Sequence, residues 1–158
     1  MQIGIHHLDT LTYLLGPATV AAAVLERRAT EAEVPTVAAV TLRHAEGATS
    51  VVTSSFVTPW SYFINLYGTR GALFYEVEPG QRVLADRQDT VSVLRRQHGD
   101  GVEFVPFEPR DMLVAQFEDF AAAIRTGGRP EVGAAEAIAA LDLVWQAIRA
   151  AAPPTHEP

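Results

Sequence analysis

The sequence contains no cysteine and no lysine, and all 12 of its basic residues are arginine. Without cysteine the chain can form no disulfide, no thiolate nucleophile and no cysteine-bound zinc site. It also has no run of about 18 apolar residues, so no membrane-spanning helix is predicted. The first residues lack the basic, apolar and small-residue segments of a secretory signal. We therefore expect a cytoplasmic protein.

Two further classes of partner are disfavoured by charge and by missing motifs. The formal net charge of -7 repels phosphate backbones, so no nucleic acid partner is expected. The chain has no glycine-rich strand–turn–helix unit for a dinucleotide, no phosphate-binding loop and no serine-nucleophile elbow. We expect the chain by itself to bind no nicotinamide cofactor.

The residues that are present have the composition of a folded globular protein. Apolar residues make up 48% of the 158 residues and charged residues 20%. This length suits one domain, which we place at residues 1–152, followed by a disordered tail at 153–158.

The order of expected elements predicts an α+β fold. Apolar residues at helical spacing predict helices over 8–15, 110–126 and 134–151, and residues 18–107 have the alternation of strands. Strands in one block and helices in another favour an open antiparallel sheet with helices packed on one face. The expected strands are 36–44 paired with 48–57, 62–67 paired with 72–77, and weaker ones near 81–85, 90–96 and 101–107.

Specific side chains are expected to make the packing surfaces of this fold. Serine and threonine residues of 48–57 suit a wet or ligand-facing surface. Aromatic residues of 62–77 suit a covered one, and they leave apolar surface for a partner. The apolar stripes expected to cover the sheet are Leu113, Phe117, Phe120, Ala121 and Ile124 of the first closing helix, and Ile138, Leu141, Trp145 and Ile148 of the second.

The densest group of catalytic residue types lies close to the first residue. His6 and Asp9 are three residues apart, so they share a helix face with Tyr13, whereas His7 shares a face with Leu11. A carboxylate beside an imidazole suits a general acid/base that works near neutral pH. A helix-start histidine with no chemistry has the same spacing, and this interpretation stays open.

A metal site is a weaker interpretation of the same histidines. It needs a third ligand from His44, His98 or a distant carboxylate, because zinc sites use three or four. Nothing in the sequence determines that geometry, and no metal is predicted.

Three segments, taken in order, resemble one protein family. They are "GIHHLDTLTYLLGP", "INLYGTRGALFYE" and "QFEDFAAAIRTGGRPEVGAAEAIAALDLVWQAIRAA". The first is similar to the Gly-x-His-x-x-Asp helix that opens the C-terminal domain of the glucose–fructose oxidoreductase, inositol dehydrogenase and rhizopine-catabolism (Gfo/Idh/MocA) family. The others are similar to its Tyr-Gly-Thr-x-Gly hairpin and its two closing helices. The likeness extends over nearly the whole chain.

The resemblance implies an open antiparallel sheet, part of a substrate pocket, and oligomerisation through the sheet. In this family a separate Rossmann domain holds NAD or NADP, and the typical reaction transfers hydride between nicotinamide and a sugar or cyclitol hydroxyl. The resemblance implies a substrate site of Gln2, His6 and Asp9, with His6 as the acid/base. Many members have Asp where this chain has Gln2, and glutamine cannot accept a proton at neutral pH.

We therefore expect a stand-alone C-terminal domain of an NAD(P)-dependent sugar or cyclitol oxidoreductase, which needs a separate Rossmann partner for activity. The family's catalytic lysine belongs to the Rossmann domain. The chain is then a natural half, a split-gene subunit or the product of a misplaced start. The alternatives are a non-enzymatic small-molecule-binding or dimeric scaffold protein, and a cofactor-free acid/base enzyme that uses His6.

Overall fold

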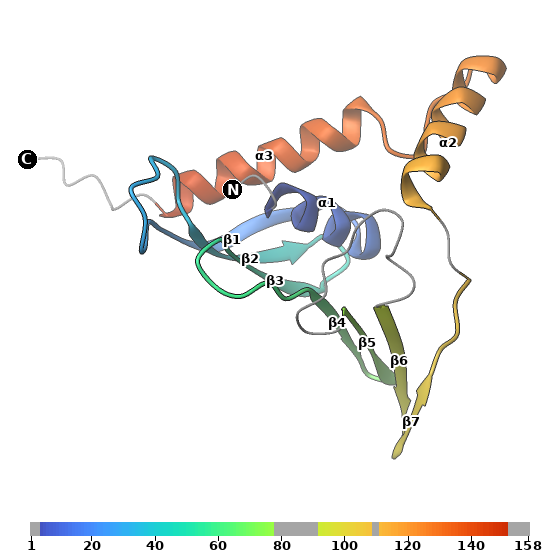
Figure 1. The fold of residues 1–158 in the computed structure, drawn as a ribbon, viewed down its shortest axis with the longest axis horizontal. Coiled ribbons are helices and arrows are strands. Elements are labelled where there is room, and N and C mark those ends of the chain that lie inside the picture. The colour runs from blue at the N-terminus through green and yellow to red at the C-terminus, as the bar shows by residue number, and fades with distance from the viewer. Residues whose placement is uncertain (1–3, 78–91, 109–110, 152–158) are drawn as a thin grey trace, which may run out of the picture. The chain divides into compact units, whose positions relative to one another are not determined.

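A computed structural model describes residues 4–77, 92–108 and 111–151 (Figure 1). Its elements, in chain order, are α1 (Gly4–Leu15), β1 (Ala18–Glu26), β2 (Val37–His44), β3 (Thr49–Ser55), β4 (Phe63–Gly68), β5 (Gly71–Val77), β6 (Ser92–His98), β7 (Gly101–Phe104), α2 (Met112–Thr126) and α3 (Ala134–Ala151). The predicted α+β class and the antiparallel pairing are confirmed. The strand expected near 81–85, Gln2 and the tail at 153–158 lie outside the described residues.

Hydrogen bonding divides the strands into two antiparallel sheets, where the sequence predicted one. The first has the order β1-β2-β3 and the second β4-β5-β6-β7. The described parts of 1–58 and 132–158 form one compact unit with the first sheet, and those of 59–131 form another with the second. Each unit is described by itself below.

The core of the first unit lies between one face of its sheet and two helices. Helix α3 packs on β1, and α1 packs on β2, β3 and α3 (Figure 1). The register pairs Val40 with Val52, and these side chains are buried together with Leu42. Leu8 of α1 and Leu143 of α3 complete this core from the helix side. Helices therefore cover one face of the sheet, as predicted, but the covering helices are α1 and α3, whereas the sequence predicted the two closing helices.

Helix α3 turns a different side to the sheet from the one predicted. The side chains buried against the sheet are those of Ala140, Leu143 and Ala147. The stripe expected to be buried is exposed instead: Ile138 66%, Leu141 50%, Trp145 58% and Ile148 42%. Alanine lets a helix backbone approach a sheet closely, and the core volume is then filled by large residues of the strands and of α1.

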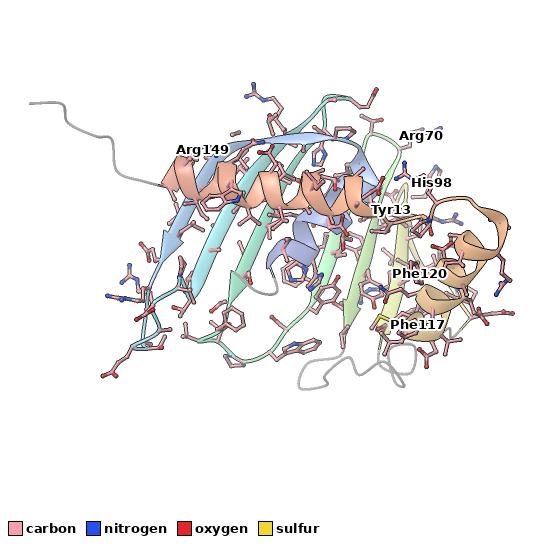
Figure 2. All side chains as sticks on the ribbon, turned by 90° about the horizontal axis from the view of Figure 1, so that it is seen from above. Tyr13, Arg70, His98, Phe117, Phe120 and Arg149 are labelled. Atoms are coloured by element: carbon pink, nitrogen blue, oxygen red, sulfur yellow. The ribbon has the colours of Figure 1, made fainter. Side chains whose placement is uncertain are left out.

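Helix α2 belongs to the second unit and has a capping residue at each end. The Asp111 carboxylate accepts hydrogen bonds from the backbone N–H groups of Leu113 and Val114, at 2.9 and 3.1 Å. Gly127 ends the helix with a left-handed backbone, at φ 68°. The stripe predicted to cover a sheet is exposed in the structure, since Phe117 is 69% and Phe120 55% accessible (Figure 2). The expected packing of this stripe is therefore not seen among the described residues.

The sheet of the second unit is stabilised by pairs of side chains across its strands. Edge-to-face contacts join Tyr62 to Tyr75 and Tyr67 to Phe74. One face carries exposed aromatic side chains among polar ones: Phe63 is 61%, Tyr67 75% and Phe104 74% accessible, and Glu76 and Arg95 form an ion pair on the same face. The aromatic residues of 62–77 were predicted to be covered; within the described residues Phe63 and Tyr67 are exposed, whereas Phe74 and Tyr75 are half-buried.

Candidate functional site

Helix α1 presents the candidate site residues on the side away from its core contact. Leu8 faces the sheet and is buried, whereas His6 and Tyr13 are exposed and Asp9 is half-buried. At about 100° per residue, His6 and Tyr13 project roughly opposite to Leu8. The helix begins at Gly4, four residues earlier than predicted, so His6 lies within its first turn.

No hydrogen bond joins the His6 imidazole to the Asp9 carboxylate among the described residues. The nearby hydroxyls instead bond within the helix, where Thr10 donates to the His6 carbonyl at 2.8 Å and Thr12 to the Asp9 carbonyl at 2.9 Å. The structure therefore leaves the imidazole of His6 accessible from outside the helix.

His7 differs from His6 in burial, as the spacing predicted. Its side chain is half-buried while that of His6 is exposed. Burial lowers the pKa of His7 below the ordinary histidine value, and the neighbouring His6 imidazole lowers it further. His7 therefore favours the neutral form, in a setting that suits packing.

The C-terminal end of α1 is held by a buried histidine on β2. His44 is 2% exposed; its Nδ1 lies 2.9 Å from the Gly16 carbonyl oxygen and its Nε2 2.8 Å from the Ser50 hydroxyl. Because a carbonyl can only accept, Nδ1 carries the proton and Nε2 accepts from Ser50. The backbone N–H of Ala45 also donates to the Pro17 carbonyl at 2.9 Å. The end of the candidate site helix is thus connected to the β2–β3 hairpin.

These contacts bear on one residue that was considered as a metal ligand, and they correct one expectation drawn from the sequence. His44 was considered as a metal ligand, but both of its ring nitrogens are already hydrogen-bonded. Ser50 was expected on a wet surface, but it pairs with Leu42 on the core face, while Thr49 and Thr53 are exposed. The alternation of Val40, Leu42 and His44 was the signal that could have placed His44 inside.

The described ranges contain neither a metal-binding cluster nor a membrane-spanning helix. No group of three or more His, Cys, Asp or Glu side chains there could hold a metal ion. No helix of those ranges is long and apolar enough to cross a membrane. Gln2, the third residue predicted for the substrate site, lies outside them.

The first 74 residues of the chain match the model of the GFO/IDH/MocA C-terminal domain. A solved structure from Desulfitobacterium hafniense, provisionally described as an NADPH-dependent oxidoreductase, is 30% identical with a TM-score of 0.88. The alignment covers 96% of this chain and 45% of that one. This chain therefore spans less than half the length of that relative.

Two more distant structures share the fold. An oxidoreductase of Agrobacterium radiobacter, in complex with NAD+, L-tartaric acid and magnesium, is 22% identical with a TM-score of 0.76, and 94% of this chain and 45% of that one are covered. An aldose–aldose oxidoreductase of Caulobacter crescentus, in complex with glycerol, is 21% identical with a TM-score of 0.78, at 94% and 43% coverage. A search of curated proteins finds no match.

Proposed function

Since the chain carries a C-terminal domain of the GFO/IDH/MocA family, we propose that it supplies the substrate side of an NAD(P)-dependent oxidoreductase. The substrate is a sugar or cyclitol, and the reaction oxidises one hydroxyl or reduces the corresponding carbonyl. The observation that carries this proposal is the 30% identity over 96% of the chain to a protein provisionally described as an NADPH-dependent oxidoreductase. In the proposal residues 1–152 act as one substrate and oligomerisation domain.

The nicotinamide belongs to a second, Rossmann-type domain, either a separate partner or the remainder of a longer protein. Such a domain would hold the nicotinamide, whose chemistry when bound would be to take or to give the hydride. This chain lacks the glycine-rich motif for a dinucleotide, and we propose that it binds no NAD or NADP by itself. Its own contribution is to bind the substrate and to move a proton.

His6 is the proposed acid/base. In oxidation an imidazole nitrogen of His6 would take the proton of the substrate hydroxyl as the carbon that bears this hydroxyl loses its hydride to the nicotinamide; in reduction His6 would return the proton to the oxygen of the former carbonyl. The exposed position of His6 on α1 supports this role, because a substrate can approach it directly. Asp9 and Gln2 are proposed to bind neighbouring substrate hydroxyls, and the Gln2 amide does so without taking a proton.

A second copy of the chain is the proposed partner at the uncovered sheet faces. On the face of the first sheet opposite the helices, Val24 is 56% and Val51 63% exposed. On the second sheet the exposed apolar side chains include Phe63, Tyr67, Val102 and Phe104. Apolar surface of this kind marks an interface more often than a monomer surface. We therefore propose a homo-oligomer formed through the sheets.

Two features of the sequence favour a second candidate function. Gln2 stands where many family members have a proton-accepting Asp, and the chain has no lysine. Both features suit a non-enzymatic binding or scaffold protein that keeps the oligomer interface and a site for a polyol.

Substrate binding can be tested on the chain alone by following the histidine ring signals in two-dimensional NMR. The probes are glucose, myo-inositol and L-tartrate, added separately. We expect the His6 ring signals to shift saturably with at least one probe, while the signals of exposed His98 stay in place as the internal control. Shifts confined to His98, or none with any probe, would argue against a substrate site at α1.

A further inference from the structure

We propose that Tyr13 extends the site at His6 by a second subsite, which binds a second sugar ring of the substrate. The substrate is then a disaccharide or a longer glycoside, whose reacting ring lies at His6 and whose next ring stacks on the phenol ring of Tyr13. This inference rests on the proposed function of His6, and it adds the size of the ligand and the residue that selects it.

Tyr13 lies on the same side of α1 as His6, two helical turns further along the chain. At 100° per residue, seven residues bring the two side chains to within about 20° of each other around the helix axis. Asp9 projects about 60° to one flank of His6 and lies between the two along the helix. The imidazole, the carboxylate and the phenol therefore follow one another in a single row along α1.

The phenol ring lies on the side of α1 away from the hydrophobic core. Tyr13 is 65% exposed, whereas Leu8 is 1% exposed and Leu11 packs against the core. A helical side chain leans toward the turn that precedes it, so the Tyr13 ring covers the surface next to Asp9. The ring therefore closes the C-terminal end of the row that begins at His6.

The length of this row determines the size of the ligand that can use all of it. Tyr13 is seven residues from His6, which at 1.5 Å per residue is about 10.5 Å along the helix axis. Asp9 is only about 4.5 Å from His6 along the same axis, which is close to one helical turn. A pyranose ring is about as long as one helical turn. A ring that reacts at His6 therefore ends beside Asp9, and Tyr13 is within reach of the next ring.

The side chains along this row have the chemistry that recognises a sugar. An aromatic ring offers an apolar face to the C–H groups of a pyranose, while carboxylate and phenol oxygens form hydrogen bonds with its hydroxyls. Thr10 projects on the same side; its hydroxyl donates to the His6 carbonyl at 2.8 Å, so its oxygen is still able to accept. Stacking on Tyr13 thus adds affinity for a second ring that a monosaccharide at His6 does not gain.

The test compares glucose with maltose on the chain alone, by following the His6 ring signals in two-dimensional NMR. We expect maltose to bind the wild-type chain about tenfold more tightly than glucose. In Tyr13→Ala this preference should be lost, while the affinity for glucose stays within about twofold of wild type. Tyr13→Phe keeps the ring and should retain the preference. The matched control, Tyr67→Ala, removes a tyrosine of the second unit that is 75% exposed, and it should bind both sugars like wild type.

Three results would overturn the second subsite: equal affinity of the wild-type chain for the two sugars, a preference for maltose that survives in Tyr13→Ala, and an equal loss of affinity for both sugars in that variant. Because Tyr13 is exposed, thermal unfolding of Tyr13→Ala is expected to match wild type. In each of these results the His6 signals of the wild-type chain still shift, so the proposed function stands. No shift with either sugar would overturn the proposed function together with this inference.

Discussion

Replacing His44 with alanine tests whether the end of α1 is fastened to the sheet as described. The wild-type imidazole is 2% exposed and bonds the Gly16 carbonyl and the Ser50 hydroxyl at 2.9 and 2.8 Å. Each such bond contributes about 0.5–1.5 kcal/mol net, and a buried group left unpaired costs about 1–3 kcal/mol. Truncating the ring also removes packing, although water that enters the space would recover part of the loss.

Together these effects predict a decrease of about 2–4 kcal/mol in the free energy of unfolding for His44→Ala. Urea unfolding followed by circular dichroism measures it, with His98→Ala as the matched control, because His98 is exposed. We expect the control to change stability by less than about 0.5 kcal/mol. A His44→Ala variant as stable as the control would refute the reasoning, because it would mean that neither hydrogen bond holds α1.

Three other predictions concern single contacts. The folded state lowers the pKa of His7, so the unfolded chain takes up a proton first and the free energy of unfolding decreases as pH falls through and below about 6.5. The His7→Gln variant should show a smaller decrease over this pH range. Urea unfolding at several pH values measures it, and a pH dependence equal to that of wild type would contradict this prediction. Asp111→Ala should destabilise α2 by about 1 kcal/mol, because two backbone N–H groups lose their acceptor. Hydrogen exchange at Leu113 and Val114 should then be faster than in wild type. Equal exchange rates would show that Asp111 does not cap the helix. Gly71→Ala should lower the midpoint temperature of thermal unfolding, because the Gly71 φ is 156° and an added Cβ would overlap the Gln97 carbonyl oxygen. An unchanged midpoint would contradict this prediction, because it would mean that the backbone of the turn adjusts to the new side chain.

Local signals in the sequence predict much of this fold. Gly16 and Gly127 both adopt left-handed backbones, at φ 82° and 68°, and each follows the last residue of a helix as its residue type indicates. The hairpin between β2 and β3 turns at Gly47, where φ is 90°. These helix ends and this turn depend on residues that are neighbours in the sequence, so they can be predicted from it.

Features that depend on distant partners were not predictable in the same way. Hydrophobicity favoured the side of α3 with the large apolar residues as its buried side. The side buried against β1 instead carries Ala140, Leu143 and Ala147, and the small alanines allow the close packing of the helix on the strand. The pairing of His44 with Gly16 joins residues 28 apart, and no local pattern encodes it. The division into two sheets likewise depends on which strands meet. For the candidate site, helical spacing placed His6 and His7 on different sides of the helix, and in the structure His6 is exposed and His7 half-buried; the role predicted for His6 stays a prediction.

The central claim is that this chain supplies the acid/base of a nicotinamide-dependent reaction through His6. The most direct test mixes the chain with the separately produced remainder of the D. hafniense protein and NADP+, adds glucose or myo-inositol, and follows NADPH absorbance. We predict turnover with the wild-type chain, a loss of about 100-fold or more with His6→Ala, and a change of less than about threefold with His7→Ala. Turnover that survives in His6→Ala, or none with the wild-type chain, would contradict the account.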